Sequence, residues 1–319
     1  MVKVSNFEKV SIIIPNYNHC KFLQKRVETV LNQTYLNFEI IILDDSSTDA
    51  SKIIIENYRT NLRVSNIVYN KVNSGNTFFQ WKKGIQLANS RYIWIAESDD
   101  FSDNRFLEKV MPLISKNENV GLVFCDSTII NEDEKVLEKW NFGNIQEKDI
   151  RDSYILKGRE FCFNYLIIKN VIPNASAVVF KKDIVLKNLE WVDSKYKNCG
   201  DWKLWLNISL NADIGYLPEY LNYFRKHGHN VTDSIFIQKL ESIHILKTII
   251  SKTSDPSESY KLYKNIFRWS FNPASWVDNF QFNHSNIISY FRGNCNYLSF
   301  KYFFHFLFKI LTKNRIDYK

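Results

Sequence analysis

Glycine and proline are scarce in this chain, which has 9 glycines and 6 prolines among 319 residues. This scarcity excludes collagen-like repeats and proline-rich stalks, because both depend on those residues. Intrinsic disorder is excluded as well, because 45% of the residues are hydrophobic and disordered chains are poor in such residues. The sequence therefore indicates a globular protein with a core, and its length suggests about two domains.

Paired cysteines and long apolar runs are also missing. The five cysteines are odd in number and show no CxxC spacing: Cys20, Cys125, Cys162, Cys199 and Cys295. We expect free thiols in a reducing compartment. Residues 1–9 are charged and lack the apolar segment of a secretory signal. No run of about 18 uncharged apolar residues is present, so we expect no ordinary transmembrane helix.

Positive charge is concentrated in the last quarter of the chain. The formal net charge is +8, and residues 236–319 hold 12 basic and 5 acidic residues. The same residues hold 19 of the 49 aromatic side chains. We therefore expect a near-neutral catalytic domain over residues 1–235 and a helical, basic and aromatic region over residues 236–319.

Strand and helix patterns alternate over the first hundred residues. Apolar runs predict buried strands at residues 10–14, 39–43 and 92–96 and a further strand at residues 64–69, and helical patterns predict helices at residues 22–31, 50–58 and 77–88. Further strands are predicted at residues 120–124, 128–130 and 177–180, and a helix at residues 201–210. Such alternation is typical of an α/β protein with helices on both faces of a sheet. Ligands of these sheets bind at the carboxyl ends of the strands.

Acidic pairs follow two of these strands, Asp44-Asp45 after the second and Asp99-Asp100 after the fourth. Carboxylate oxygens are suitable ligands for Mg²⁺ or Mn²⁺. The alternative is structural, with Asp44-Asp45 forming an Asx turn and Asp99 or Asp100 capping a helix at residues 105–114. Taken singly, the acidic pairs favour the structural interpretation.

An ordered series of motifs changes that balance. The series comprises Ser11-Ile-Ile-Ile-Pro15-Asn-Tyr17-Asn18, Leu31-Asn-Gln-Thr34, Asp44-Asp45-Ser-Ser-Thr-Asp49, Asn73-Ser-Gly75 and Glu97-Ser-Asp99-Asp100. It resembles the family 2 glycosyltransferases, inverting enzymes that use nucleotide-sugar donors, and the resemblance covers roughly residues 8–232. The resemblance implies the GT-A fold, a Rossmann-like mixed sheet with helices on both faces, here followed by a C-terminal helical segment.

The resemblance also implies a donor site, and its residues are carried over by position. Pro15 and Tyr17 match positions that line the base pocket, and Asp45 matches the carboxylate that accepts a hydrogen bond from the uracil ring N–H. Three further positions belong to the donor-binding set, namely Asn73, Gly75 and Arg225, of which Arg225 matches a residue that approaches the diphosphate.

A metal site and a catalytic base follow from the same resemblance. Asp100 matches the main ligand of Mn²⁺ or Mg²⁺, Asp99 lies near the ribose and the metal, and His227 matches a late metal ligand. The simpler interpretation of His227 is a solvated loop, and we interpret His19 as a loop residue.

Asp201 matches the catalytic base, and its alternative role is a helix N-cap. Many relatives have Glu-Asp where this chain has Gly200-Asp201. The acceptor-orienting glutamate of those relatives is therefore missing here.

These residues lead to an expected function. We expect a metal-dependent inverting glycosyltransferase that moves a sugar from a UDP-sugar to a hydroxyl of a glycan or lipid-linked acceptor, in the synthesis of bacterial surface polysaccharide. The alternative is a non-catalytic nucleotide-sugar or glycan-binding module on the same fold. The presence of all the expected site carboxylates disfavours that alternative.

The end of the chain predicts one more partner. Residues 298–311 are apolar except for Ser299 and a stripe at i, i+4 made by Lys301, His305 and Lys309. Such a helix suits a membrane interface, on the inner face of the cell membrane of a cytoplasmic protein. The alternative is packing on the catalytic domain or on a second copy in a homodimer. No nucleic-acid-binding motif accompanies the charge.

Overall fold

The computed structural model describes residues 8–146, 152–187, 192, 195–227 and 235–270. The chain divides into two compact units, Met1–Glu241 and Ser242–Lys319. The helix expected at residues 298–311 lies outside the described residues. Within the described ranges, no helix has the length and apolar character needed to cross a membrane.

The strands of the described residues form one ten-stranded sheet. They are β1 (Val10–Asn16), β2 (Phe38–Asp44), β3 (Val64–Tyr69), β4 (Tyr92–Ile95), β5 (Phe101–Ser102), β6 (Val120–Ile130), β7 (Val136–Trp140), β8 (Tyr154–Leu156), β9 (Val178–Lys181) and β10 (Asp213–Arg225). The order is β3-β2-β1-β4-β9-β6-β10-β5, with β7 beside β6 and β8 beside β10. Strand β1 pairs in parallel with β2 and β4, whereas β9 runs antiparallel between β4 and β6. The mixed sheet confirms the expected α/β class.

One long strand replaces two predicted short ones. Residues 120–124 and 128–130 belong to the single strand β6, and all eleven of its residues are buried. The polar residues between the two apolar runs suggested a break, but both have partners inside the fold. Asp126 accepts from Tyr216 Oη at 2.8 Å, and Ser127 Oγ accepts from Asn222 Nδ2 at 2.9 Å.

The helices connect and cover the strands. They are α1 (Cys20–Leu31), α2 (Ser51–Glu56), α3 (Thr77–Leu87), α4 (Phe106–Ser115), α5 (Gly143–Gln146), α6 (Gly158–Phe161), α7 (Lys182–Leu186), α8 (Gly200–Ser209), α9 (Ile235–Ile250) and α10 (Pro256–Ser270). A π-helical turn spans Cys162–Leu166, and a 3₁₀ turn spans Ala175–Ala177. Four of the cysteines, Cys20, Cys125, Cys162 and Cys199, are free thiols, as expected, and Cys295 lies outside the described residues.

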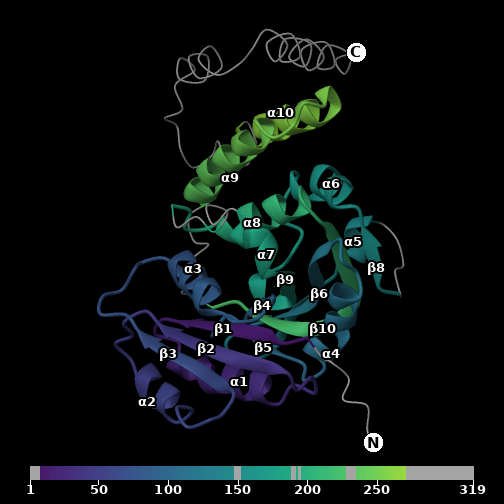
Figure 1. Cartoon of the computed structure of the whole chain (residues 1–319). Helices are drawn as coiled ribbons and strands as arrows, with labels where there is room; N and C mark the ends of the chain where they lie inside the picture. Colours follow the sequence, from purple (N-terminus) through teal and green to yellow (C-terminus); the bar gives the residue numbers. More distant parts are fainter. Residues whose placement is uncertain (1–7, 147–151, 188–191, 193–194, 228–234, 271–319) are drawn as a thin grey trace, which may run out of the picture. The chain divides into compact units, whose positions relative to one another are not determined.

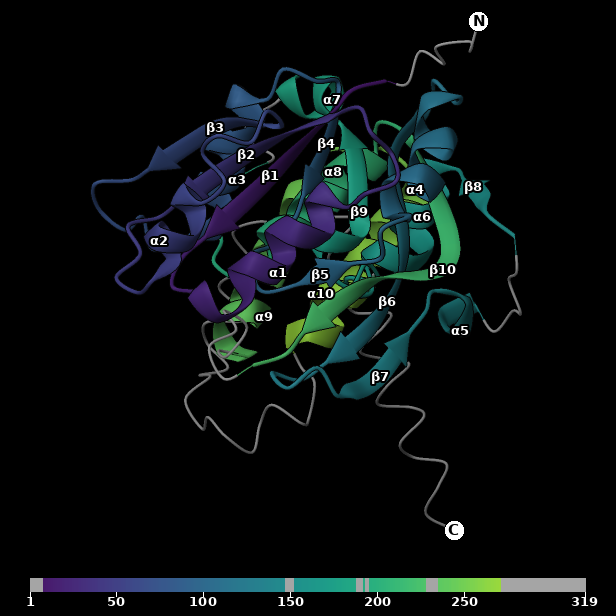
Figure 2. The same ribbon diagram turned by 90° about the horizontal axis from the view of Figure 1, so that it is seen from below.

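The two faces of the sheet carry different helices (Figure 1). Helices α1, α2 and α4 share one core with β1, β2 and β4, in which Leu23 and Val27 pack with Ile12. Figure 2 shows α1 in front of these strands. Helix α3 covers the other face, and a Cβ on its Gly84 would stand 2.4 Å from Ile13 Cγ2. The missing side chain therefore lets α3 approach β1 closely.

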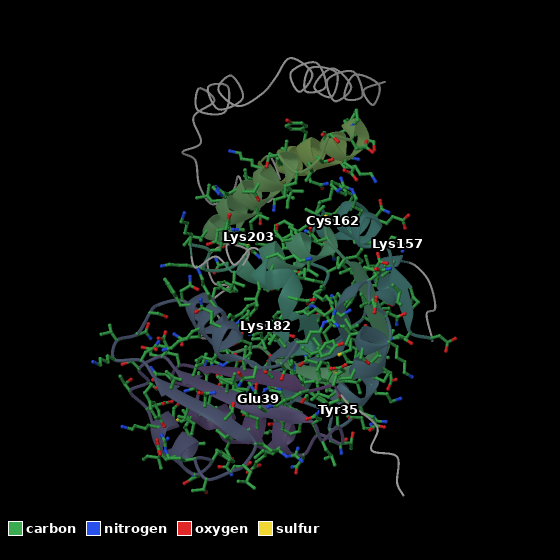
Figure 3. All side chains as sticks on the ribbon, viewed as in Figure 1. Tyr35, Glu39, Lys157, Cys162, Lys182 and Lys203 are labelled. Atoms are coloured by element: carbon green, nitrogen blue, oxygen red, sulfur yellow. The ribbon has the colours of Figure 1, made fainter. Side chains whose placement is uncertain are left out.

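The amino-terminal edge of the sheet is fixed by Glu39 (Figure 3). Its buried carboxylate accepts from Ser11 Oγ at 2.6 Å, Lys9 Nζ at 2.9 Å and the Asn89 N–H at 2.9 Å. Burial alone would raise the pKa of Glu39, but these hydrogen bonds outweigh it and hold the pKa below its usual value. The Glu39 carboxylate is therefore committed to contacts inside the protein.

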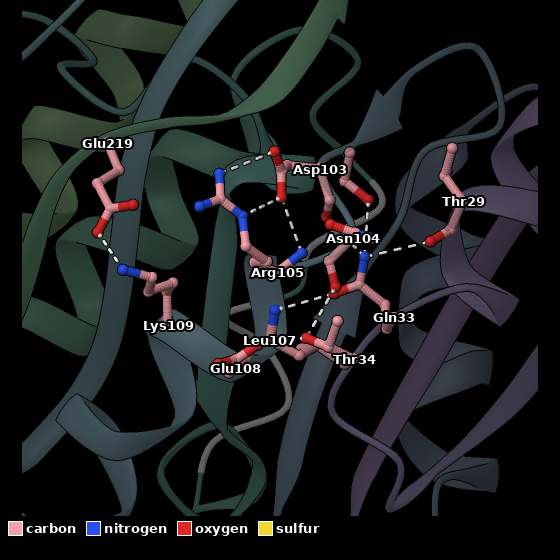
Figure 4. Close-up of polar contacts among 11 residues, drawn as sticks. Thr29, Gln33, Thr34, Asp103, Asn104, Arg105, Leu107, Glu108, Lys109 and Glu219 are labelled. Carbon is pink, nitrogen blue, oxygen red and sulfur yellow. Dashed lines mark hydrogen bonds and ion pairs between the residues drawn. The ribbon is translucent and has the colours of Figure 1, made fainter.

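A buried amide joins the end of α1 to the start of α4 (Figure 4). Gln33 donates to the Asp103 carbonyl at 2.7 Å and to the Thr29 carbonyl at 3.2 Å, and it accepts from the Leu107 N–H at 3.0 Å. Gln33 belongs to the Leu31-Asn-Gln-Thr34 motif of the sequence. The motif therefore fixes the backbone directly after Asp99-Asp100.

Candidate active site

The carboxyl ends of β1 and β2 are joined by polar side chains. Asn16 ends β1 and donates to Asp44 Oδ1 at 2.8 Å. Asp44 ends β2 and also accepts from the N–H of Ser47 at 2.9 Å and from its hydroxyl at 2.6 Å. Asp44 thus closes a turn through Ser47, three residues on, and not the Asx turn that the sequence suggested, in which the side chain accepts from the N–H two residues on. The next residue, Asp45, faces partners that follow β3.

Asp45 is buried and held by several donors. Its carboxylate accepts from Asn70 Nδ2 at 2.6 Å, Gln80 Nε2 at 2.8 Å, the Ser74 N–H at 3.0 Å and the Ser74 hydroxyl at 2.7 Å. Three of these contacts reach Oδ1, and Ser74 supplies those to Oδ2. The carboxylate is therefore fixed in place, and Oδ2 has the greater remaining capacity to accept. Sequence analysis did not find Asn70, Ser74 or Gln80.

The Asn-x-Gly motif acts on Asp45 through its middle residue. Asn73 Oδ1 accepts from the Gly75 N–H, and Gly75 adopts φ +69°. A side chain in this left-handed conformation costs about 1–2 kcal/mol, so glycine suits the turn. The turn presents both donors of Ser74 to Asp45. Asn73 and Gly75 thus shape the surroundings of Asp45.

The two expected base-pocket residues of β1 differ in exposure. Pro15 is buried within the strand, opposite Leu43. Tyr17 follows the strand and leaves 44% of its surface exposed. Of the two residues, only Tyr17 has a side chain exposed enough to contact a ligand.

A pocket of about 260 Å³ lies next to the Asp45 partners. It is lined by Asn70, Ser74, Phe79, Gln80, Lys82, Lys83 and Gln86. Lys83 Nζ donates to Asn70 Oδ1 at 2.7 Å, and Asn70 in turn donates to Asp45. Helix α3 carries two lysines at the pocket, Lys82 and Lys83. Lys83 is linked to the Asp45 carboxylate through the side chain of Asn70.

Asp100 is buried, and its carboxylate accepts hydrogen bonds from three other residues. Its Oδ2 accepts from Asn174 Nδ2 at 2.5 Å and from Ser176 Oγ at 2.6 Å, and its Oδ1 accepts from the Arg225 N–H at 2.9 Å. Burial, and then the charge of Asp99, raise the pKa of Asp100 to about 7. The carboxylate that the resemblance names as the main metal ligand therefore accepts hydrogen bonds from three residues of the protein itself.

Asp99 lies with two histidines instead. Its Oδ2 is 2.9 Å from His227 Nε2, and ligand atoms of His19, Asp99 and His227 all lie within 4.8 Å of one another. Burial would raise the pKa of Asp99, but the His227 hydrogen bond and the two imidazoles hold it below its usual value. The same hydrogen bond raises the pKa of His227. The three groups form a set of nitrogen and oxygen donors suited to a metal ion.

His19 is the member of this set that sequence analysis missed. It lies three residues after the end of β1 and precedes α1, and its Nδ1 is 2.8 Å from Ser98 Oγ. Its ring centroid is 5.5 Å from that of His227. The sequence could have indicated a site role for His19, because it follows β1 at the edge of the sheet where ligands bind.

Arg225 is buried behind the acidic residues. Only 1% of its surface is exposed, and its Nε donates to the Asp99 carbonyl at 2.8 Å. Its Nη1 donates to the carbonyls of Asn131 and Glu132, and its Nη2 to Glu134. The guanidinium that was expected near a diphosphate therefore connects the Asp99-Asp100 backbone to the turn between β6 and β7.

Asp201 stands in the first turn of α8 and is partly buried. Its Oδ1 accepts from the Trp202 N–H at 2.6 Å and its Oδ2 from Asn170 Nδ2 at 3.0 Å. Burial raises the pKa of Asp201 to about 6, against the lowering effect of these two donors. A carboxyl with this pKa is mostly ionised at neutral pH and accepts protons readily.

One turn of α3 contacts all three groups of acidic residues. Gln80 donates to Asp45, and Trp81 Nε1 donates to Glu97 Oε1 at 2.7 Å. The ring of Phe78 lies against Gly200, next to Asp201. Helix α3 therefore contacts Asp45, Glu97 and the residue next to Asp201.

The mixed α/β sheet, with acidic residues after β2 and β4, has the architecture of the GT-A fold. Residues 11–171, about half of the chain, match the profile of Glycosyl transferase family 2. The chain belongs to this family and is an enzyme of the glycosyltransferase class.

Relatives and solved structures agree with this assignment. An uncharacterized glycosyltransferase of Haemophilus influenzae is 25% identical over 73% of this chain and 70% of its own length. The Staphylococcus aureus poly(ribitol-phosphate) beta-N-acetylglucosaminyltransferase TarP is 27% identical over 57% of this chain and 51% of its own length.

Among solved structures, S. aureus TarS 1–349 in complex with UDP has a TM-score of 0.65 and 17% identity, covering 88% of this chain and 78% of TarS 1–349. The Pyrobaculum calidifontis mannosyltransferase PcManGT in complex with GDP-Man and Mn²⁺ has a TM-score of 0.56 and 12% identity, covering 99% and 89%. At these identities the structures establish the shared fold.

Proposed function

We propose that this chain is a metal-dependent inverting glycosyltransferase with a UDP-sugar donor and a hydroxyl acceptor. The observation that carries the proposal is the gathering of His19, Asp99 and His227 at the carboxyl edge of the sheet. Asp45 is held near that edge by its own donors, and Asp201 supplies a carboxyl with a raised pKa.

Asp201 serves as the single general base. An inverting transfer needs one group to take the proton of the acceptor hydroxyl as its oxygen attacks the anomeric carbon. The bond from that carbon to the diphosphate oxygen breaks in the same step, and the nucleoside diphosphate leaves with its electron pair. A retaining glycosidase would use two facing carboxyl groups about 5 Å apart. The absence of a side chain on Gly200 agrees with a single carboxylate here.

The nucleotide base binds at Asp45 and Tyr17. Uracil presents a ring N–H, and Asp45 Oδ2 accepts fewer hydrogen bonds from the protein than Oδ1 does. The exposed ring of Tyr17 offers a surface for the base to pack on. The fold shared with TarS, which was solved in complex with UDP, supports this donor class.

The divalent ion is held by Asp99, His227 and His19. Two imidazoles and one carboxylate fit a transition ion better than Mg²⁺, which prefers oxygen ligands, so we propose Mn²⁺ over Mg²⁺. PcManGT was solved in complex with Mn²⁺. When bound, the ion neutralises charge on the leaving diphosphate. Asp100 and Arg225 keep the backbone of Asp99 in position.

The acceptor is a hydroxyl of a glycan or a lipid-linked glycan in bacterial surface polysaccharide synthesis. TarP, whose name specifies a poly(ribitol-phosphate) acceptor, supports a polymer of the cell surface. The basic and aromatic residues 236–319 would attach the enzyme to the anionic inner face of the membrane, where such acceptors are made.

A donor screen tests the proposed function. The enzyme is incubated with UDP-, GDP- and dTDP-sugars, with Mn²⁺, with Mg²⁺ and with EDTA, and the released nucleoside diphosphate is measured. We expect release from one UDP-sugar with Mn²⁺ and none with EDTA. Release from GDP- or dTDP-sugars alone, or full activity in EDTA, would overturn the donor or the metal assignment.

The nucleotide contact gives a separate prediction. Asp45→Ala is expected to weaken UDP binding about 10–100-fold, because a hydrogen bond to a charged group is worth roughly 1.5–3 kcal/mol. Isothermal titration calorimetry with UDP and Mn²⁺ measures this change. Asp44→Ala is the poorer control, since Asp44 holds the turn, so we choose the exposed Glu28→Ala on α1. An unchanged UDP affinity in Asp45→Ala would remove Asp45 from the base site.

A further inference from the structure

Three side chains of residues 170–176 hold two separate carboxylates of the site. Asn174 and Ser176 donate to Asp100 at 2.5 and 2.6 Å. Asn170, at the other end of this segment, donates to Asp201 at 3.0 Å. One short connection before β9 therefore reaches both the acidic motif after β4 and the first turn of α8.

The side chain of Asn170 is held in one orientation. Its Oδ1 accepts from the Ile172 N–H at 3.2 Å, which forms an Asx turn. With the oxygen committed to that turn, the amide nitrogen must be the atom that faces Asp201. The π-helical turn that precedes this segment is anchored to α8, because Trp202 Nε1 donates to the Leu166 carbonyl at 2.8 Å. Asn170 is thus a fixed donor aimed at a carboxylate on a neighbouring element.

The residue before Asp201 cannot supply this contact. Position 200 is glycine, and a Cβ there would stand 2.6 Å from the ring of Phe78. Phe78 is itself 4% exposed and has little room to move. A glutamate beside Asp201 is therefore excluded by the packing of α3 on α8, and the carboxylate must be oriented from elsewhere.

We propose that Asn170 is the positioning residue of Asp201. Its amide fixes the plane of the carboxylate and stabilises the ionised form, so that the base is oriented and ready to accept the proton of the acceptor. This proposal rests on the proposed role of Asp201 as the base. In this proposal, residues 170–176 fix the position of Asp201 relative to the Asp99-Asp100 motif, because they donate hydrogen bonds to both.

Two substitutions separate this role from a purely structural one. Asn170→Ala removes the donor to Asp201 and the acceptor for Ile172 together. Asn170→Asp keeps an oxygen that accepts from Ile172 but turns a second carboxylate oxygen toward Asp201. If the Asx turn were the whole role of Asn170, Asn170→Asp would keep the native kcat on the high-pH plateau, where Asp201 is ionised, because the turn is preserved.

The test is the pH profile of kcat with the preferred donor and acceptor. Both variants are expected to lower kcat about tenfold at neutral pH, and their acid limb should lie at higher pH than the native limb near pH 6. The shift should be larger in Asn170→Asp, because a neighbouring carboxylate disfavours ionisation of Asp201. Affinity for UDP should stay native. Lys169→Ala, an exposed neighbour, is the matched control.

The outcomes distinguish this proposal from the function beneath it. An inactive Asp201→Asn, together with native rates and pH profiles in both Asn170 variants, would overturn the positioning role alone. An active Asp201→Asn would overturn the base assignment and the proposal with it. Unfolding of Asn170→Ala, seen by circular dichroism, leaves Asn170→Asp to decide.

Discussion

Asp201→Asn is expected to lower kcat by about 10²–10⁴-fold, the usual contribution of a general base. Asparagine has the same shape as aspartate but does not take the proton of the acceptor hydroxyl. Donor binding should remain, since Asp201 lies on α8 and the proposed nucleotide contacts lie on other elements. Single-turnover transfer and UDP calorimetry on the same preparation measure the two effects separately.

The native enzyme should show the matching pH dependence. Burial raises the pKa of Asp201 to about 6, so the ionised base is present above that pH and is lost as the pH falls through it. The acid limb of kcat should therefore lie near pH 6. Asp183→Asn, at a surface carboxylate paired with Arg91, is the matched control. Native turnover by Asp201→Asn would return this residue to the role of helix capping.

Asp99→Asn is expected to abolish metal-dependent turnover. The amide has no negative charge to offer a divalent ion, and the hydrogen bond with His227 Nε2 would lose its ionic character. Added Mn²⁺ should no longer stimulate release of UDP, even at concentrations that saturate the native enzyme. Mn²⁺ binding, measured directly by electron paramagnetic resonance, should weaken together with activity.

Asp100→Asn should fail in a different way. Asp100 accepts from Asn174, Ser176 and Arg225, so an amide there sets its own N–H groups against these donors. We expect a lower free energy of unfolding, by about 1–3 kcal/mol, measured by urea denaturation. An Asp99→Asn enzyme that binds Mn²⁺ normally, beside an Asp100→Asn enzyme that does not, would reverse the proposed roles.

His19→Ala completes this comparison, because it removes one imidazole of the proposed set without touching Asp99 or His227. Weaker Mn²⁺ binding by His19→Ala is expected if all three residues are ligands, and unchanged binding would remove His19 from the proposed set.

Position along the chain explains which site residues the sequence could predict. Strand ends in a parallel sheet meet at one edge, so the motifs after β1, β2 and β4 pointed to one region. That reasoning placed both acidic pairs, Asp44-Asp45 and Asp99-Asp100, at this edge. The resemblance then named Asp100 as the main metal ligand. Which of two adjacent carboxylates is taken up by protein donors depends on tertiary partners such as Asn174 and Ser176, which no local pattern specifies.

Other site features depend on contacts that no local pattern encodes. The Arg225 guanidinium is taken up by carbonyls of the turn between β6 and β7, a turn that sequence patterns did not predict. Strand β7 is five residues long and mostly exposed, and Glu138-Lys139 interrupts its apolar residues, so it gave no continuous apolar run. The amide of Asn170 reaches Asp201 across 31 residues, and that distance depends on the fold of the intervening chain.

The single turn of α3 that touches all three acidic regions has a consequence for engineering this enzyme. Phe78, Gln80 and Trp81 contact the surroundings of Asp201, Asp45 and Glu97 respectively. The rings of Phe78 and Trp81 also pack on each other, with centroids 4.9 Å apart, and substitutions of residues in contact have non-additive effects, typically of about 0.5–3 kcal/mol. A graft of the α3 segment from a relative with another donor preference would therefore also change the surroundings of Asp201, the proposed base. Libraries aimed at new sugar pairs should vary these three positions together with residues 170–176, because Phe78 packs on Gly200 and Asn170 contacts Asp201.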